Sequence, residues 1–143
     1  MAKSITTCNN LLKLLFNATA WATIADNAAA SPLTNLYLSL HTADPSTGNS
    51  QQTNETGYTN YARVAVVRTN AGWTVATNTA VNAALVQFPQ CGASGATLTH
   101  VAIGTAATGV GNVLYAGPLN SSLAVASGIQ PQFNASSLTV TET

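Results

Sequence analysis

The chain has 143 residues, 6% of them charged, and its four cationic and four anionic side chains give a formal net charge of +0. So few cations exclude the continuous basic surface that a nucleic-acid partner requires. So few titratable groups also leave little for acid–base or metal chemistry. The length is that of one ordinary domain. A polar but uncharged surface is typical of a protein inside an assembly, because a free monomer without net charge tends to associate.

The N-terminal segment is predicted to be a helix near residues 4–16, with Ser4 as its N-cap. Apolar residues recur there every three or four positions, at Ile5, Cys8, Leu12, Leu15 and Phe16. We expect Leu12, Leu15 and Phe16 to be buried, either in the core of the subunit or against a partner.

The helical pattern extends toward Ile24, and residues 28–32 are typical of a linker. The sequence therefore predicts an N-terminal helical arm at 1–32, followed by one compact β-sandwich domain at 33–143. No membrane partner is expected, because no apolar run approaches the roughly 20 residues that a spanning helix needs. The longest apolar run, Leu11 to Phe16, is interrupted by Lys13, so no signal peptide is predicted either.

From Leu33 onward the hydrophobic period becomes two. Residues 36–41 predict a half-buried strand that ends with His41 on its outer face. Residues 42–58 then form a long polar loop, and loops beyond about 12–15 residues are usually functional or mobile. We therefore expect a contact surface here, with Tyr58 and Tyr61 as its exposed aromatic residues.

Further short strands are predicted at residues 61–68, 73–75, 84–88, 97–103, 113–116, 123–125, 132–133 and 138–141. Their regular spacing, without alternating helices, favours an all-β fold: an antiparallel β-sandwich, jelly-roll-like, with one N-terminal α-helix.

Chemistry-bearing groups are sparse and scattered. His41, Asp44, Cys91 and His100 could bind a metal only if the fold gathered them. The glycines at 92–95 and 109–111 lack the spacing of a nucleophile elbow or a dinucleotide loop. We expect no catalytic residue, no metal and no cofactor, hence no enzyme. Cys8 and Cys91 are expected to be reduced thiols.

Several motifs occur in a recognisable order. They are LYLSLHTADP at 36–45, GY at 57–58, YAR at 61–63, FP at 88–89, THVAIGTA at 99–106, LYAGPL at 114–119, SGI at 127–129 and LTVT at 138–141. This order resembles a family of small virion proteins of tailed bacteriophages, which often carry the label tail fibre protein. The resemblance implies a structural virion component that is synthesised in the cytoplasm of the bacterial host.

The position on the virion is a separate question. A fibre shaft needs long repeats or coiled-coil heptads, and none is present. We therefore expect a decoration (cement) protein on the outer surface of the phage head. Its partners would be the major capsid protein and copies of itself, as a dimer or trimer. The candidate assembly contacts are Leu11, Leu12, Leu15, Phe16, Tyr58 and Tyr61. The alternative is a tail fibre or tail-tip component that binds a host receptor through the loop at 42–58.

Overall fold

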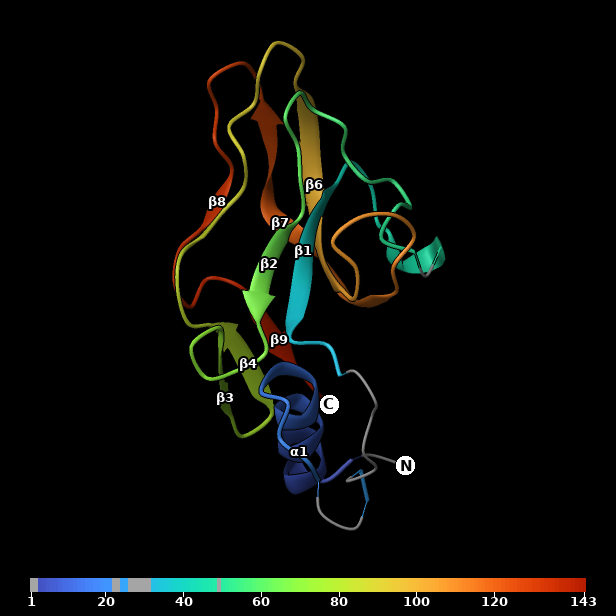
Figure 1. Cartoon of the computed structure of the whole chain (residues 1–143), viewed down its shortest axis with the longest axis vertical. Helices are drawn as coiled ribbons and strands as arrows, with labels where there is room; N and C mark the ends of the chain where they lie inside the picture. The colour runs from blue at the N-terminus through green and yellow to red at the C-terminus, as the bar shows by residue number, and fades with distance from the viewer. Residues whose placement is uncertain (1–2, 22–23, 26–31, 49) are drawn as a thin grey trace. The chain divides into compact units, whose positions relative to one another are not determined.

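The computed structural model describes residues 3–21, 24–25, 32–48 and 50–143 (Figure 1). The elements are α1 (Ile5–Phe16), β1 (Asn35–His41), the short 3₁₀ helix η1 (Ser46–Gly48), β2 (Val64–Val67), β3 (Trp73–Ala76), β4 (Thr79–Asn82), β5 (Val86–Gln87), β6 (Ala96–Gly104), β7 (Val113–Val125), β8 (Gln132–Phe133) and β9 (Thr139–Thr141). The pairs β1–β6, β6–β7, β3–β4 and β4–β9 are antiparallel. The expected fold class is confirmed: antiparallel sheets with a single N-terminal helix in the described part of the chain, consistent with an all-β sandwich.

Contacts group the chain into two compact units. Unit 1 comprises Met1–Asn35, Val66–Val86 and Phe133–Thr143, and unit 2 comprises Leu36–Ala65 and Gln87–Gln132. This grouping differs from the expected division after residue 32, which stays a prediction.

Helix α1 in unit 1 begins and ends where local residues fix it. Ser4 is the N-cap, and its side-chain oxygen accepts a hydrogen bond at 3.2 Å from the backbone N–H three residues later. The helix ends at Phe16. Ala18 then has a left-handed φ of 50°, and a right-handed α-helix cannot continue through a residue in this conformation. The helix near residues 4–16 is therefore confirmed, and its extension is wrong. Most of the expected linker, residues 28–31, lies outside the described residues.

The helix packs against β3 and β4 through one row of side chains (Figure 1). Cys8, Leu12 and Phe16 are buried, four residues apart from one another. The Phe16 ring meets the Trp73 ring edge to face, with centroids 4.7 Å apart. The expected burial is thus confirmed for Leu12 and Phe16. Leu15 is only half-buried, because it lies one position outside this row.

Arg68 holds the C-terminal end of α1. Its Nε and Nη2 donate to the carbonyl oxygens of Leu15 and Leu14 at 2.7 and 2.8 Å, and Nη1 donates to Leu33 O at 2.6 Å. The last carbonyls of a helix have no partner inside the helix, and a cation there also complements the helix dipole. This guanidinium therefore fixes the segment before β1 to the end of α1.

Strand β4 was not predicted from the sequence. It lies between β3 and β9 in a three-stranded sheet, and it ends at Asn82, whose side chain is fully buried. The Asn82 amide nitrogen donates to Ala84 O and Asn134 O at 2.8 Å each, and its oxygen accepts from Leu138 N at 2.9 Å. A polar residue therefore occupies a core position, so the apolar alternation that marks a strand is broken.

Strand β1 is central in the sheet of order β2-β1-β6-β7, and within unit 2 it pairs with β6 so that Leu38 lies opposite Ile103. Leu36, Leu40 and Leu98 are also buried here. The expected strand at 61–68 is shorter than predicted, because only Val64–Val67 is extended into the sheet.

The sequence predicts separate strands at residues 113–116 and 123–125. In the structure they belong to one strand, β7, whose pairing with β6 has an irregular register. Leu98 pairs with Leu123, whereas His100 pairs with Pro118. Residues 119–122 therefore bulge from the ladder, which explains why the pattern is interrupted there.

Candidate functional site

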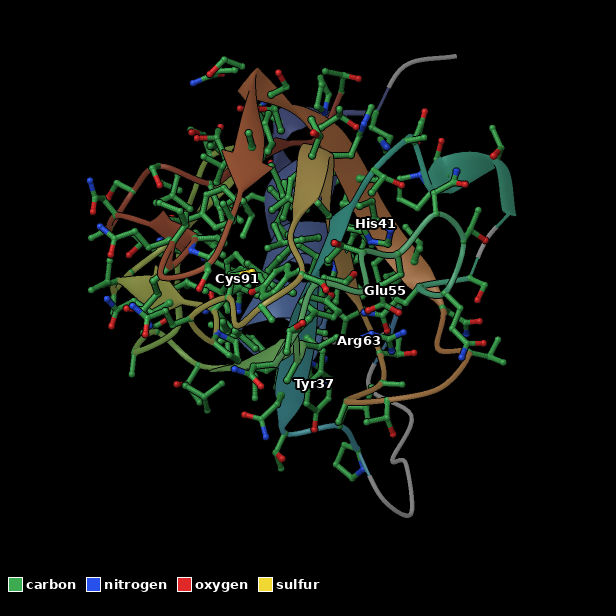
Figure 2. All side chains as sticks on the ribbon, turned by 90° about the horizontal axis from the view of Figure 1, so that it is seen from above. Tyr37, His41, Glu55, Arg63 and Cys91 are labelled. Atoms are coloured by element: carbon green, nitrogen blue, oxygen red, sulfur yellow. The ribbon has the colours of Figure 1, made fainter. Side chains whose placement is uncertain are left out.

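The polar loop at residues 42–58, called the first loop below, is anchored by a buried polar network in unit 2. Ser39, His41 and Gln51 are each 0% exposed. The expectation that His41 lies on an outer, solvated face is therefore wrong, because this loop covers that face of β1. Figure 2 shows His41, Glu55 and Arg63 together on one side of β1.

His41 has a defined tautomer. Its Nδ1 lies 2.9 Å from Thr53 O, and because a carbonyl oxygen only accepts, Nδ1 carries the hydrogen. Its Nε2 lies 2.9 Å from Ser39 Oγ and accepts the hydroxyl hydrogen. Burial is the main cause that lowers the His41 pKa, opposed by the hydrogen bond to Thr53. The imidazole is therefore neutral and ties the first loop to β1.

Gln51 connects the first loop to the loop at residues 105–112, called the second loop below. Its side-chain nitrogen donates to Tyr37 O at 3.2 Å and to Ser39 Oγ at 3.4 Å, and its oxygen accepts from Ala106 N at 3.0 Å. Its backbone N–H donates to Val110 O at 2.9 Å. One fully buried side chain thus satisfies backbone groups of a strand and of the second loop.

A buried ion pair reinforces the same junction. Arg63 Nε and Nη2 donate to the two carboxylate oxygens of Glu55 at 2.6 and 2.7 Å. The guanidinium also donates to Ala106 O at 2.9 Å and Gly109 O at 2.8 Å in the second loop. The Arg63 side chain is 3% exposed and that of Glu55 is 16% exposed. The hydrogen bond to Glu55 raises the Arg63 pKa, so the guanidinium stays charged.

Tyr61 completes this network. Its hydroxyl donates to a Glu55 carboxylate oxygen at 2.8 Å and accepts from Leu40 N at 3.1 Å. Burial raises its pKa. The sequence contains no pattern that predicts the pairing of Glu55 with Arg63, because both residues lie outside regular elements. The only signal was the rarity of charge in the chain.

The exposure expected for Tyr58 is wrong. Tyr58 is 2% exposed, and its hydroxyl donates to Pro89 O at 2.9 Å. Its ring meets the Tyr61 ring edge to face at 5.3 Å, and the Tyr61 ring stacks on Phe88 at 6.4 Å. Burial raises the Tyr58 pKa to about 12. Both tyrosines therefore belong to an internal aromatic cluster of unit 2.

The candidate assembly contacts stay a prediction. They are Leu11, Leu12, Leu15, Phe16, Tyr58 and Tyr61. In this conformation Leu12 and Phe16 are 0% exposed, so a partner could reach them only if α1 moved.

The candidate metal ligands are not gathered into a site. Within the residues that the structure describes, no group of three or more His, Cys, Asp or Glu side chains is placed to hold a metal ion. Asp44 instead accepts a 2.9 Å hydrogen bond from Ser46 N, which lowers its pKa. Cys8 and Cys91 are buried free thiols. No helix among the described segments has the length and apolar character of a membrane span.

Gly104 gives a direct test of the packing between the loops. A Cβ at this position would lie 2.2 Å from Gln51 Cδ and 2.6 Å from Asn112 O. Gly104→Ala is expected to lower the free energy of unfolding by about 1–3 kcal/mol, as overpacking does. Gly117→Ala is the matched control, since nothing lies within 4 Å of its Cβ position. Urea unfolding of both variants checks the prediction, and equal stability of the two would contradict it.

The fold and this network define an all-β protein in which buried polar side chains fix two loops. The family model described as "Podophage GP4 fiber I protein gp80" matches residues 2–141, so the chain belongs to this family. The resemblance to phage virion proteins is confirmed in this coarser form, and placement on the head is not part of the match. A search of curated proteins finds no match.

Proposed function

We propose that the chain is a structural subunit of a fibre on the virion of a tailed phage. The family description names a fibre protein, and the match extends over residues 2–141. The expectation of a head decoration protein rested on the absence of shaft repeats. A fibre built from several chains needs such repeats only in the chain that forms the shaft. A β protein without repeats therefore fits an attachment or junction segment.

The observation that carries the fibre proposal is the family match over residues 2–141. The use of charge in the described residues supports its structural part. Arg63 pairs with Glu55, Lys3 pairs with Glu142, and Arg68 binds backbone carbonyls. These groups hold the chain together, which favours a structural role over a catalytic one. Loops fixed on a rigid scaffold are also suited to binding, because little entropy is lost when they meet a partner.

The surface of the two loops suits an uncharged interface. Its exposed side chains are mostly polar: Thr42, Ser46, Thr47, Gln52, Asn54, Thr108 and Asn112. Asp44 is a charged exception, and Val110, which is 64% exposed, is an apolar one. Contacts of this kind depend on hydrogen bonds and shape, and they are little affected by salt. Neighbouring copies of the chain and other virion proteins are the partners that we propose.

Copy number per particle tests the proposal. Purified virions are separated on a gel, and this protein is quantified against the major capsid protein. A fibre subunit is expected at a small multiple of the tail symmetry. Hundreds of copies per particle would contradict the fibre proposal and favour head decoration.

A further inference from the structure

Two histidines lie directly opposite each other on neighbouring strands of unit 2. His41 on β1 is the register partner of His100 on β6. Directly opposed residues of an antiparallel pair project from the same face, with Cβ atoms about 4.5–5.5 Å apart. His41 is fully buried, whereas His100 is half-buried and its Nδ1 lies 2.9 Å from Thr99 Oγ1.

The hydrogen bonds of His41 leave no place for a second proton. Nδ1–H already donates to Thr53 O, and Nε2 already accepts from Ser39 Oγ. A proton on Nε2 would turn this acceptor into a donor toward an oxygen to which Gln51 also donates. The Ser39 hydroxyl hydrogen would then need a new acceptor, so the network must rearrange.

The surrounding charges compensate such a proton only in part. Glu55 forms a β-bridge with His41 and its charge raises the His41 pKa, but both its oxygens are bound to Arg63. Arg63 is itself a cation, and its charge and that of His100 both lower the His41 pKa. Asp44 is the remaining acidic group with an electrostatic interaction with both histidines, and it is exposed.

We propose that His41 is an acid-sensitive latch for the first loop: the neutral imidazole holds the loop on β1, and its protonation releases the loop. The imidazolium keeps its hydrogen bond to Thr53 O. The contact that protonation disturbs is Ser39 Oγ, to which Gln51 of the first loop also donates. The opposed His100 adds to the effect, because its charge also lowers the His41 pKa.

The direction follows from proton linkage. The His41 pKa is lowered in the closed form, whereas an exposed histidine in an open loop has a pKa of about 6.5. The open form therefore binds the proton more readily. As the pH falls from about 6.5 toward the lowered pKa, the opening constant rises by at most about tenfold per pH unit. Above this range the loop stays closed, independently of pH.

Hydrogen exchange of the full chain at about pH 7.5 and about pH 5, corrected for intrinsic exchange rates, measures the opening. The reporters are the backbone amides of Thr42, Gln51 and Thr56, which donate to Asn54 O, Val110 O and Leu40 O. The reference amides are Ala83 and Glu142 in unit 1. Faster exchange at low pH is expected for the reporters and not for the reference amides. Unchanged reporter exchange would overturn the proposal.

Two variants identify the titrating group. His41→Gln removes the ionisable group but keeps a donor and an acceptor, so the acid-induced increase in exchange should disappear. His100→Gln removes the opposing charge, so His41 gains a proton at less cost in the closed loop and the increase should become smaller. An increase of wild-type size in His41→Gln would overturn the proposal.

A measurement on the wild-type chain covers the case in which His41→Gln does not fold. The imidazole signals of His41 are followed by NMR over the same pH range. The midpoint of His41 protonation should coincide with the midpoint of loop opening. A loop that opens while His41 stays neutral, or that stays closed after His41 is protonated, would contradict the latch.

Discussion

Arg63→Met is expected to lower the free energy of unfolding by about 3–5 kcal/mol, because it leaves a largely buried carboxylate without its partner. The guanidinium that is lost bonds both oxygens of Glu55 and the carbonyls of Ala106 and Gly109. The change therefore also removes a tie between the first and second loops. Urea unfolding at neutral pH measures the loss.

A double variant separates this cause from a general effect of mutation. Replacing Glu55 by Leu in addition to Arg63→Met removes the unpaired charge and substitutes apolar groups for the pair. The double variant should be more stable than Arg63→Met alone, since replacing both members of a buried pair is often close to neutral. Glu55→Leu alone is measured as well. If the loss of stability in the double variant equals the sum of the losses in Arg63→Met and Glu55→Leu, the buried-charge explanation is wrong.

Phe16→Ala should destabilise the protein by about 3–5 kcal/mol, the usual cost of removing a buried aromatic ring. Phe16 is 0% exposed, and its ring centroid lies 4.7 Å from the ring centroid of Trp73. Ile5→Ala on the same helix is the matched control, because Ile5 is 57% exposed and should change stability by less than about 0.5 kcal/mol. Thermal and urea unfolding compare the two variants. Similar losses for both would mean that α1 does not pack against β3 as described.

Features governed by neighbours in sequence could be predicted. Ser4 marks the start of α1, and the row of Cys8, Leu12 and Phe16 marks its buried face, because capping and helical periodicity are local. Strand β1 follows from the alternation of its leucines. Such signals are independent of the rest of the fold, so they could be interpreted before the structure was known.

Features that depend on distant polar contacts could not be predicted. Gln51 and Arg63 bind carbonyls and amides of the second loop, more than forty positions later in the sequence. No periodicity in the sequence predicts such contacts between side chains and distant backbone groups. A long polar loop therefore seemed exposed, although His41 and Gln51 beneath it are fully buried. Strand β4 was missed for the same reason, since Asn82 replaces an apolar core residue.

The low charge content also has a different meaning in the structure. From composition it indicates a neutral surface, suited to an assembly. In the described residues several of the charges instead hold the chain itself, as Arg68 does with the end of α1 and Arg63 with the second loop. Composition gives the number of charges, and only the fold gives their partners.

Electron microscopy of phage particles that lack this protein tests the fibre proposal most directly. Mutant virions are imaged beside wild-type virions, and both are assayed for heat resistance of the packaged genome and for attachment to host cells. The account predicts intact heads of unchanged heat resistance, with fibres missing or truncated at the tail and with reduced attachment. Complete fibres on particles whose heads release DNA more readily on heating would contradict it.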